Sequence, residues 1–312
     1  MAVNLLLSFA FHGPRGYDID LARVRADLTC GNLMIDSGAF TAFSKGVRIR
    51  LEEYAEWLER WRGAWQYAMN LDVIGNPEAS ARQCARLHAR GLPVMPVFTA
   101  GARLAEFDAM VRDSRYVAVG GLAGRRISKD GLAARVGMLQ RRAADQGGGI
   151  HALGIGALSV LRRARPYSAD SSACSAAFLY GSLVYFDGRE VRQTATSNRA
   201  ALARHRDHIT AQDIPLAEVL RLGKLPGKSH RPQMVRGYSL TYAVADEHLK
   251  RAAPVAAPDG LPPGPQLYNS VTPDWMVYPT ARLDRELHDG TWRPRAWQRY
   301  GGRHACPGAV AA

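Results

Sequence analysis

The chain has 312 residues, which is enough for one large domain or for a barrel with an appended module. Hydrophobic residues make up 47% and charged residues 22%, a globular composition that excludes disorder over the whole chain. Forty-one Lys and Arg against 28 Asp and Glu give a net charge of +13, which favours a polyanionic partner. A solvated basic surface that binds no nucleic acid is the alternative.

Short apolar runs alternate along the chain with stretches of helical length. The predicted strands are Asn4–Phe11, Leu33–Asp36, Gln66–Asp72, Pro93–Phe98, Tyr116–Gly120, His151–Gly156, Pro166–Asp170 and Ser182–Asp187. The predicted helices between them are Leu51–Arg62, Glu78–Arg90, Arg103–Arg112, Gly131–Asp145 and Leu158–Arg163. Strands separated by helices indicate a parallel sheet, and eight such strands close a (β/α)8 TIM-like barrel. A doubly wound open sheet is the alternative fold.

The pattern changes after the last predicted strand. A hairpin-like Asp187-Gly188 turn precedes predicted helices at Asn198–Ile209 and Leu216–Leu222. We therefore expect a catalytic barrel over residues 1–222 and, over 223–312, a basic helical or extended C-terminal extension that packs on the barrel and contacts nucleic acid.

The expected extension is rich in cations and prolines. Its first part, Gly223–Arg236, is basic and turn-rich, and Ala252–Pro265 carries five prolines, which is typical of a linker or surface strap. Tryptophans and arginines alternate in its last part. This stretch is either a clamp on nucleic acid or a strap that completes the barrel.

The cysteines and the apolar start of the chain bear on its compartment. Met1–Phe11 lacks a basic start and is expected to be a buried strand rather than a signal peptide. No segment approaches the ~18 apolar residues that a membrane helix needs. The cysteines lie far apart without a C-x-x-C pair, which fits a reducing compartment; they are Cys30, Cys84, Cys174 and Cys306. We expect a cytoplasmic protein without membrane contact.

Three aspartates, Asp36, Asp72 and Asp170, stand at the ends of predicted strands. The active site of a (β/α)8 barrel lies at the carboxyl ends of its strands, so these carboxylates are expected to converge. Two carboxylates can together cleave a glycosidic bond. One attacks the anomeric carbon as the nucleophile, and the other handles the proton of the leaving group. The structural alternatives are that Asp170 or Asp72 caps the next helix and that Asp36 begins a simple turn.

Four short motifs resemble, in the same chain order, those of the tRNA-guanine transglycosylase superfamily, over roughly Leu33 to Ser175. They are Asp36-Ser37-Gly38-Ala39-Phe40-Thr41, Gly120-Gly121-Leu122-Ala123, Leu153-Gly154-Ile155-Gly156 and Ala169-Asp170-Ser171. The resemblance implies that Asp170 attacks C1′ and forms a covalent glycosyl–enzyme intermediate. It implies that Asp36 is the general acid and base for the departing and incoming bases.

The resemblance also implies a base pocket. Asp72 would read the Watson–Crick edge of guanine or a 7-deazaguanine, Phe40 and Leu153 would sandwich the base, and backbone groups from Gly120 to Leu122 would meet its substituents. Thr99 stands where the family usually has Gln, so the contact to the carbonyl edge of the base is expected to be either shortened or mediated by water. The substrate-binding residues implied are Asp72, Phe40, Ser37, Thr99, Gly120, Gly121, Leu122 and Leu153.

The family's zinc cluster, Cys-x-Cys-x-x-Cys with a later His, has no counterpart in this chain. A site assembled from Cys174, His205, His208, His304 and Cys306 is the alternative to surface histidines. We expect no metal and no cofactor.

A transglycosylase without that cluster is similar to the DNA-modifying branch of the superfamily, encoded in phages and bacteria. The expected reaction exchanges guanine in DNA for a 7-deazaguanine such as preQ0, and the expected partners are DNA and the free 7-deazaguanine base. The expected nucleic-acid contacts are Arg293, Arg295, Arg299, Lys224, Lys228 and Arg231. The alternatives are a tRNA-guanine transglycosylase, a nucleic-acid glycosylase that hydrolyses the intermediate, and a barrel that binds nucleic acid without catalysis.

Overall fold

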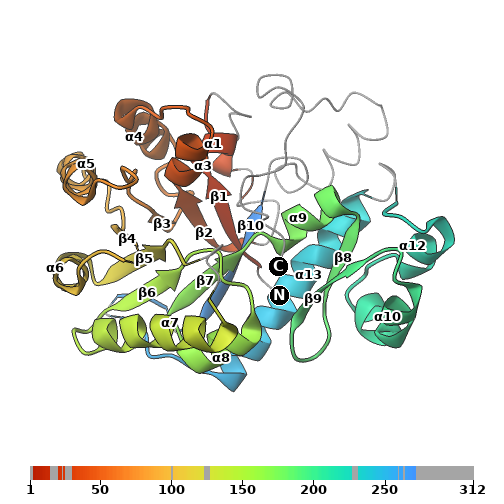
Figure 1. Cartoon of the computed structure of the whole chain (residues 1–312). Helices are drawn as coiled ribbons and strands as arrows, with labels where there is room; N and C mark the ends of the chain where they lie inside the picture. Colours follow the sequence, from red (N-terminus) through yellow and green to blue (C-terminus); the bar gives the residue numbers. More distant parts are fainter. Residues whose placement is uncertain are drawn as a thin grey trace.

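The computed structural model of the protein describes residues 3–14, 20–22, 24, 30–99, 101–122, 127–226, 231–258, 260–262 and 264–271. Its main feature is a parallel eight-stranded sheet with the strand order β3-β2-β1-β10-β7-β6-β5-β4 (Figure 1). The strands are β1 Val3–Ser8, β2 Cys30–Asp36, β3 Tyr67–Ala68, β4 Val97–Thr99, β5 Tyr116–Gly120, β6 Gly149–Ala152, β7 Ser168–Ser171 and β10 Gln266–Val271. The mixed α/β fold with a parallel sheet is therefore as the sequence predicts.

The sheet is curled, and its two edges meet. Met69, just after β3, bridges in parallel to Met95, just before β4. The Met95 N–H donates to the Ala68 carbonyl and the Asn70 N–H donates to the Met95 carbonyl, both at 2.8 Å. A curled parallel sheet whose edges are joined in this way is compatible with a TIM-like barrel.

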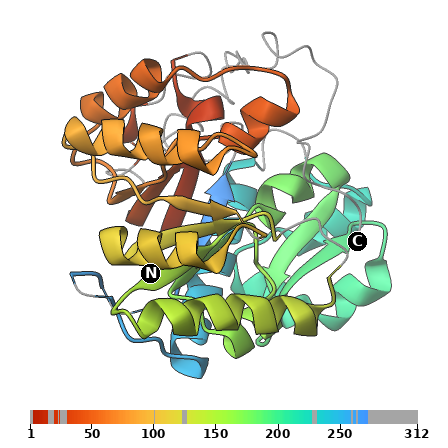
Figure 2. The ribbon, with the colours of Figure 1, turned by 60° about the vertical axis from the view of Figure 1, so that its left-hand side comes forward.

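Helices follow most of the strands and cover the outside of the sheet (Figures 1 and 2). They are α1 Phe9–His12, α3 Ala39–Ser44, α4 Leu51–Arg60, α5 Pro77–Ala89, α6 Leu104–Ser114, α7 Lys129–Ala144, α8 Leu158–Ala164, α9 Ala173–Tyr180 and α13 Arg231–Ala252. The predicted helices that begin at Leu51, Glu78, Arg103, Gly131 and Leu158 are confirmed within two residues at their starts. On α4, Tyr54, Trp57 and Leu58 are buried against the sheet because they share one helical face.

The core has two parts because strand side chains alternate between the two faces of the sheet. One cluster fills the inside of the curled sheet with Leu6, Met34, Met69, Met95, Tyr116, Ala118, Tyr167 and Tyr268. The larger cluster lies between the sheet and the helices and includes Leu5, Leu7, Val117 and Val119. Neighbouring residues of one strand, such as Leu5 and Leu6, thus belong to different clusters.

The strand predicted at Ser182–Asp187 is present, but its predicted place as the eighth strand of the barrel is wrong. Ser182–Asp187 contains β8 Ser182–Phe186, which pairs antiparallel with β9 Val191–Ala195 in a separate hairpin. The eighth place in the sheet is taken by β10, which pairs in parallel with β1 and β7. Both faces of β8 are buried because the hairpin packs against α9 and α13, so its apolar run resembles that of a central barrel strand.

The stretch expected as an extension packed on the barrel therefore contributes a strand to the sheet itself. Helix α13 begins inside the segment Gly223–Arg236, which the sequence suggested to be turn-rich, and it packs against β10, β1 and β8. The Asp246 carboxylate of α13 accepts the Leu267 backbone N–H of β10 at 2.6 Å and pairs with Lys250 at 2.7 Å.

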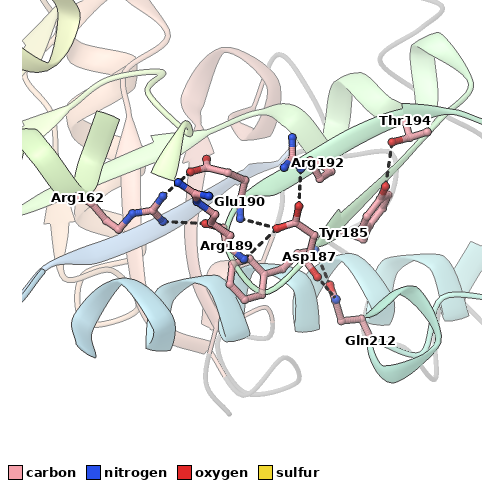
Figure 3. Close-up of polar contacts among 9 residues, drawn as sticks. Arg162, Tyr185, Asp187, Arg189, Glu190, Arg192, Thr194 and Gln212 are labelled. Carbon is pink, nitrogen blue, oxygen red and sulfur yellow. Dashed lines mark hydrogen bonds and ion pairs between the residues drawn. The ribbon is translucent and has the colours of Figure 1, made fainter. Parts of the chain in front are cut away.

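The hairpin is fixed by a polar network at its turn, shown in Figure 3. The Asp187 carboxylate accepts the backbone N–H groups of Arg189 and Glu190 at 2.9 and 2.7 Å, and it pairs with Arg192 (Figure 3). Arg162 of α8 reaches across to Glu190 at 2.6 Å, which ties the hairpin to the barrel helices. The predicted turn at Asp187-Gly188 is thus confirmed.

Three short helices follow the hairpin: α10 Arg199–Arg204, α11 Arg206–Ala211 and α12 Leu216–Leu222. The predicted helix Asn198–Ile209 is broken at His205, which ends α10 and begins α11. Gln212, after α11, exchanges two hydrogen bonds with the backbone of Phe186 at 2.9 and 2.7 Å, so these helices and the hairpin form one unit (Figure 3).

Candidate active site

Three aspartates lie near the carboxyl ends of β2, β3 and β7. Asp36 is the last residue of β2 and pairs in register with Ser8, the last residue of β1. Asp170 lies on β7 opposite Tyr268, and Asp72 follows β3. Since the strands are parallel, these carboxyls share one rim of the sheet. The charge of Asp170 raises the pKa of Asp36, and the charge of Asp36 raises the pKa of Asp72.

Asp36 lies in an environment that favours its protonated form. Burial raises the pKa of this carboxyl most, and the charge of Asp170 adds to the increase. Hydrogen bonds from the Gly38 backbone N–H and the Ser8 hydroxyl oppose this increase and lower the pKa of Asp36. The net direction is upward, which suits a group that donates a proton.

The pKa of Asp72 is raised into the neutral range. Burial first, and the charge of Asp36 second, raise the pKa of Asp72 from 3.8 to about 7. The carboxyl can therefore change its charge near neutral pH when a ligand brings N–H donors to it.

Asp170 lies in a different environment, one that supplies hydrogen-bond donors. It is 5% exposed, and its Oδ1 accepts the Gly154 backbone N–H at 2.7 Å and the His151 Nε2 at 3.3 Å. N–H donors stabilise a negative carboxylate. The rim thus holds one carboxyl that is favoured as an acid and a second that lies within hydrogen-bond distance of two N–H groups.

The Gly154-x-Gly156 pair shapes the end of β7. Gly154 has a φ of +70° and presents its N–H to Asp170. A Cβ on Gly156 would lie 2.4 Å from the Ser171 Cβ, so only glycine lets this segment approach β7. Gly38, with a φ of +76°, is also required by a close approach, because an added Cβ would lie 2.4 Å from the Ala10 Cβ.

The helix-capping alternatives for these aspartates are wrong. The N-caps of α3, α5 and α9 are Gly38, Asn76 and Ser172. The Asn76 side chain accepts the Ala79 N–H at 2.9 Å, which is the cap that Asp72 was suggested to supply. Asp72 and Asp170 are therefore left for another role, whereas the Asp36 carboxyl accepts the Gly38 backbone N–H, as the turn alternative expects.

A buried polar chain behind Asp170 was missed at the level of sequence. His151 on β6 and Ser168 on β7 are fully buried, with His151 Nδ1 2.7 Å from Ser168 Oγ. Tyr116 Oη of β5 lies 2.6 Å from the same Ser168 Oγ. The strand period of two places His151 on the face of Leu153 and Ser168 on the face of Asp170, but it does not predict that the two side chains meet.

The residues expected to form the base pocket occupy mixed positions. Leu153 is partly buried and lies against Gly120, where an added Cβ would meet the Leu153 side chain at 3.5 Å. Thr99 is exposed at the end of β4, in register with Gly120. Gly121 is exposed with a φ of +72°, and Leu122 is buried. These residues lie at the ends of β4 and β5 and in the loops after β5 and β6, at the rim that carries Asp170.

Two further residues of the expected pocket lie at the start of α3. The Phe40 side chain is 62% exposed, so the sandwich of a base between Phe40 and Leu153 stays a prediction. Ser37 is buried, and its Oγ accepts the Ala39 N–H at 3.4 Å, which places the hydroxyl in the turn before α3. Its contact with a substrate also stays a prediction.

Most of the expected nucleic-acid contacts fall outside the described residues, namely Lys228 and the three C-terminal arginines, Arg293, Arg295 and Arg299. Lys224 is exposed after α12, and Arg231 is the first residue of α13. Within the described ranges, no group of three or more His, Cys, Asp or Glu could hold a metal ion, and no helix is long and apolar enough to cross a membrane. His304 and Cys306 lie beyond these ranges, so the expectation that the chain binds no zinc stays a prediction.

Comparison with known proteins adds no family assignment. No protein-family model matches the chain, and no curated protein matches it significantly.

Proposed function

We propose that the protein is a base-exchanging transglycosylase on a (β/α)8 barrel, with Asp170 as the nucleophile and Asp36 as the general acid and base. The observation that carries the proposal is the pair of carboxyls at one rim in unlike environments. Burial raises the pKa of Asp36, while Asp170 accepts two N–H donors. Separated environments of this kind let two carboxyls work as acid and nucleophile at the same pH.

The reaction divides into two half-reactions. In the first, a lone pair of the Asp170 carboxylate forms a bond to C1′ of the nucleoside, and the C1′–N9 bond breaks. The electron pair of that bond goes to N9 of guanine, and the Asp36 carboxylic acid supplies the proton. In the second, the Asp36 carboxylate removes the N9 proton of the incoming base, N9 attacks C1′, and the ester electrons return to Asp170.

Asp72 is proposed to read the Watson–Crick edge of the base. Guanine and 7-deazaguanines present adjacent N–H donors on this edge, and an ionised carboxylate accepts both. Because the pKa of empty Asp72 is raised to about 7, base binding near pH 7 is expected to release a proton from this carboxyl.

The proposed polymer is DNA, with the free 7-deazaguanine base as second substrate. The support is the net charge of +13 together with the resemblance to the DNA-modifying branch of the superfamily. A guanosine in a duplex has to be flipped out of the stack before Asp170 can reach its C1′. A tRNA substrate is the second candidate, because phosphate charge alone does not separate DNA from RNA.

The test is exchange of labelled guanine into DNA and into tRNA by the wild-type chain. Incorporation into DNA that is lost in Asp170→Ala supports the proposal, with Asp207→Asn, an exposed aspartate of α11, as the control. Incorporation into tRNA alone would move the activity to tRNA. Loss of guanine without incorporation would identify a hydrolytic glycosylase, and binding without either reaction would identify a non-catalytic barrel.

A further inference from the structure

His151 is the only histidine of the described residues that shares a hydrogen bond with one of the three rim aspartates. Its side chain is fully buried at the inside of the sheet, and its ring packs edge-on against the Tyr268 ring at a centroid distance of 5.8 Å. Each ring nitrogen has a partner: Nδ1 lies 2.7 Å from Ser168 Oγ, and Nε2 lies 3.3 Å from Asp170 Oδ1. The ring is therefore held in one orientation by contacts on two edges and one side.

One set of hydrogen-bond directions fits the proposed nucleophile. An ionised Asp170 accepts at one end of the chain, and the Tyr116 hydroxyl, whose pKa burial raises well above its usual value, keeps its proton and can donate at the other. A consistent chain then runs from Tyr116 O–H to Ser168 Oγ, from Ser168 O–H to His151 Nδ1, and from His151 Nε2–H to Asp170 Oδ1. In this chain the His151 ring donates through Nε2 and accepts through Nδ1.

Both donors to Asp170 address the same oxygen. Gly154 N–H and His151 Nε2 both point to Oδ1, and the described residues direct no hydrogen bond to Oδ2. The geometry leaves Oδ2 as the oxygen with free lone pairs, while Oδ1 is held by His151 and Gly154.

We propose that the Tyr116–Ser168–His151 chain is a positioning device that, with Gly154, fixes Oδ1 of Asp170 and leaves Oδ2 to attack C1′. This inference rests on the proposed function. When Oδ2 forms its bond to C1′, Oδ1 becomes the ester carbonyl and keeps both donors. When the incoming base displaces Oδ2, the negative charge returns to the carboxylate, and the two donors stabilise it.

Loss of the His151 donor therefore has an effect that simple structural damage lacks. The free carboxylate loses more stabilisation than the neutral ester, so the equilibrium between free enzyme and glycosyl–enzyme moves toward the adduct. In His151→Asn, which does not reach Asp170, the exchange rate is expected to fall about 100-fold, as for loss of one donor to a developing charge. The fraction of enzyme held as adduct at saturating DNA is expected to rise.

The conservative variant is His151→Gln, because the glutamine amide nitrogen comes close to the place of Nε2 and can donate to Oδ1. It is expected to recover much of the rate and to lower the adduct fraction again. The matched control is His248→Gln, a partly buried histidine of α13 that packs on the Phe186 ring with centroids 5.1 Å apart. That variant should change neither the rate nor the adduct fraction.

The experiment measures exchange of labelled guanine and the adduct fraction by intact mass after acid quench, for the wild type and the three variants. A fall of rate and adduct together in His151→Asn, or an unchanged rate, would overturn the proposal. Nitrogen-15 NMR of labelled histidine, assigned by the His151→Asn spectrum, is expected to show the neutral Nε2–H form, and an Nδ1–H form would also overturn it. If the wild type neither exchanges guanine nor forms an adduct, the proposed function is wrong, and the NMR result still decides whether His151 donates to Asp170.

Discussion

Replacing Asp72 with Asn is expected to stabilise the protein at neutral and alkaline pH. The pKa of Asp72 is raised to about 7 in the folded chain, against an ordinary value of 3.8. Between these values the folded state holds a proton that the unfolded state has released, so stability falls as the pH rises and is lowest above pH 7. The difference between the two pKa values lowers the free energy of unfolding by about 4 kcal/mol at pH 8. This figure is an upper bound because the carboxyl is partly exposed.

The assay is urea unfolding of wild type and Asp72→Asn from pH 5 to pH 8. The advantage of the variant is expected to grow by about 2 kcal/mol over this range, since at pH 5 part of the cost is already present. Asp207→Asn gives the baseline for removing a surface carboxylate. An advantage that stays constant with pH, or that shrinks as the pH rises, would refute the description of Asp72 as a buried carboxyl beside Asp36. The same variant is expected to lose affinity for the free base.

Three further predictions concern stability, catalysis and nucleic-acid binding. Gly38→Ala should lower the free energy of unfolding by at least about 1–2 kcal/mol. Gly46→Ala should lower it by less, because Gly46 has a positive φ but no atom within 4 Å of an added Cβ. Equal losses in urea unfolding would disprove the close approach of Gly38 to Ala10. Asp36→Asn should slow guanine exchange by about 10²–10⁴-fold, and a rate near that of the wild type would exclude Asp36 as the proton donor. Alanine in place of Arg293, Arg295 and Arg299 should flatten the salt dependence of DNA binding without changing which base is accepted. The slope should fall by about 0.9 for each phosphate that is no longer neutralised, and an unchanged slope would show that these arginines do not contact DNA.

The carboxyl ends of the strands could be predicted from sequence because each is marked locally. Asp36 and Asp170 end apolar runs and are followed by small residues, and the parallel order then places them at one rim. The eighth strand could not be predicted in the same way. β10 carries Gln266, Asn269 and Ser270, and Gln266 accepts the Asn32 side chain at 3.0 Å inside the sheet. The Asn269 side chain is buried without a hydrogen-bond partner among the described residues. Buried polar residues of this kind make a central strand look like an edge.

The polar chain behind Asp170 shows the same limit. His151, Ser168 and Tyr116 lie on three strands, and nothing in the local sequence of any one of them indicates a partner on the next. Their contact depends on the register of β5, β6 and β7, in which Ala118 pairs with His151 and His151 with Ser168. The long helix α13 was missed for a different reason, because its start follows basic and turn-forming residues and its first residues carry no acidic signal.

The most direct test of the proposed mechanism is to identify the residue that carries the covalent intermediate. The wild-type chain is incubated with a guanine-containing DNA oligonucleotide, quenched in acid and digested, and the modified peptide is located by mass spectrometry. The mechanism predicts one nucleic-acid adduct on the peptide that contains Asp170, which is absent in Asp170→Ala and present in Asp207→Asn. Guanine exchange that continues in Asp170→Ala, or an adduct on any other residue, would contradict it.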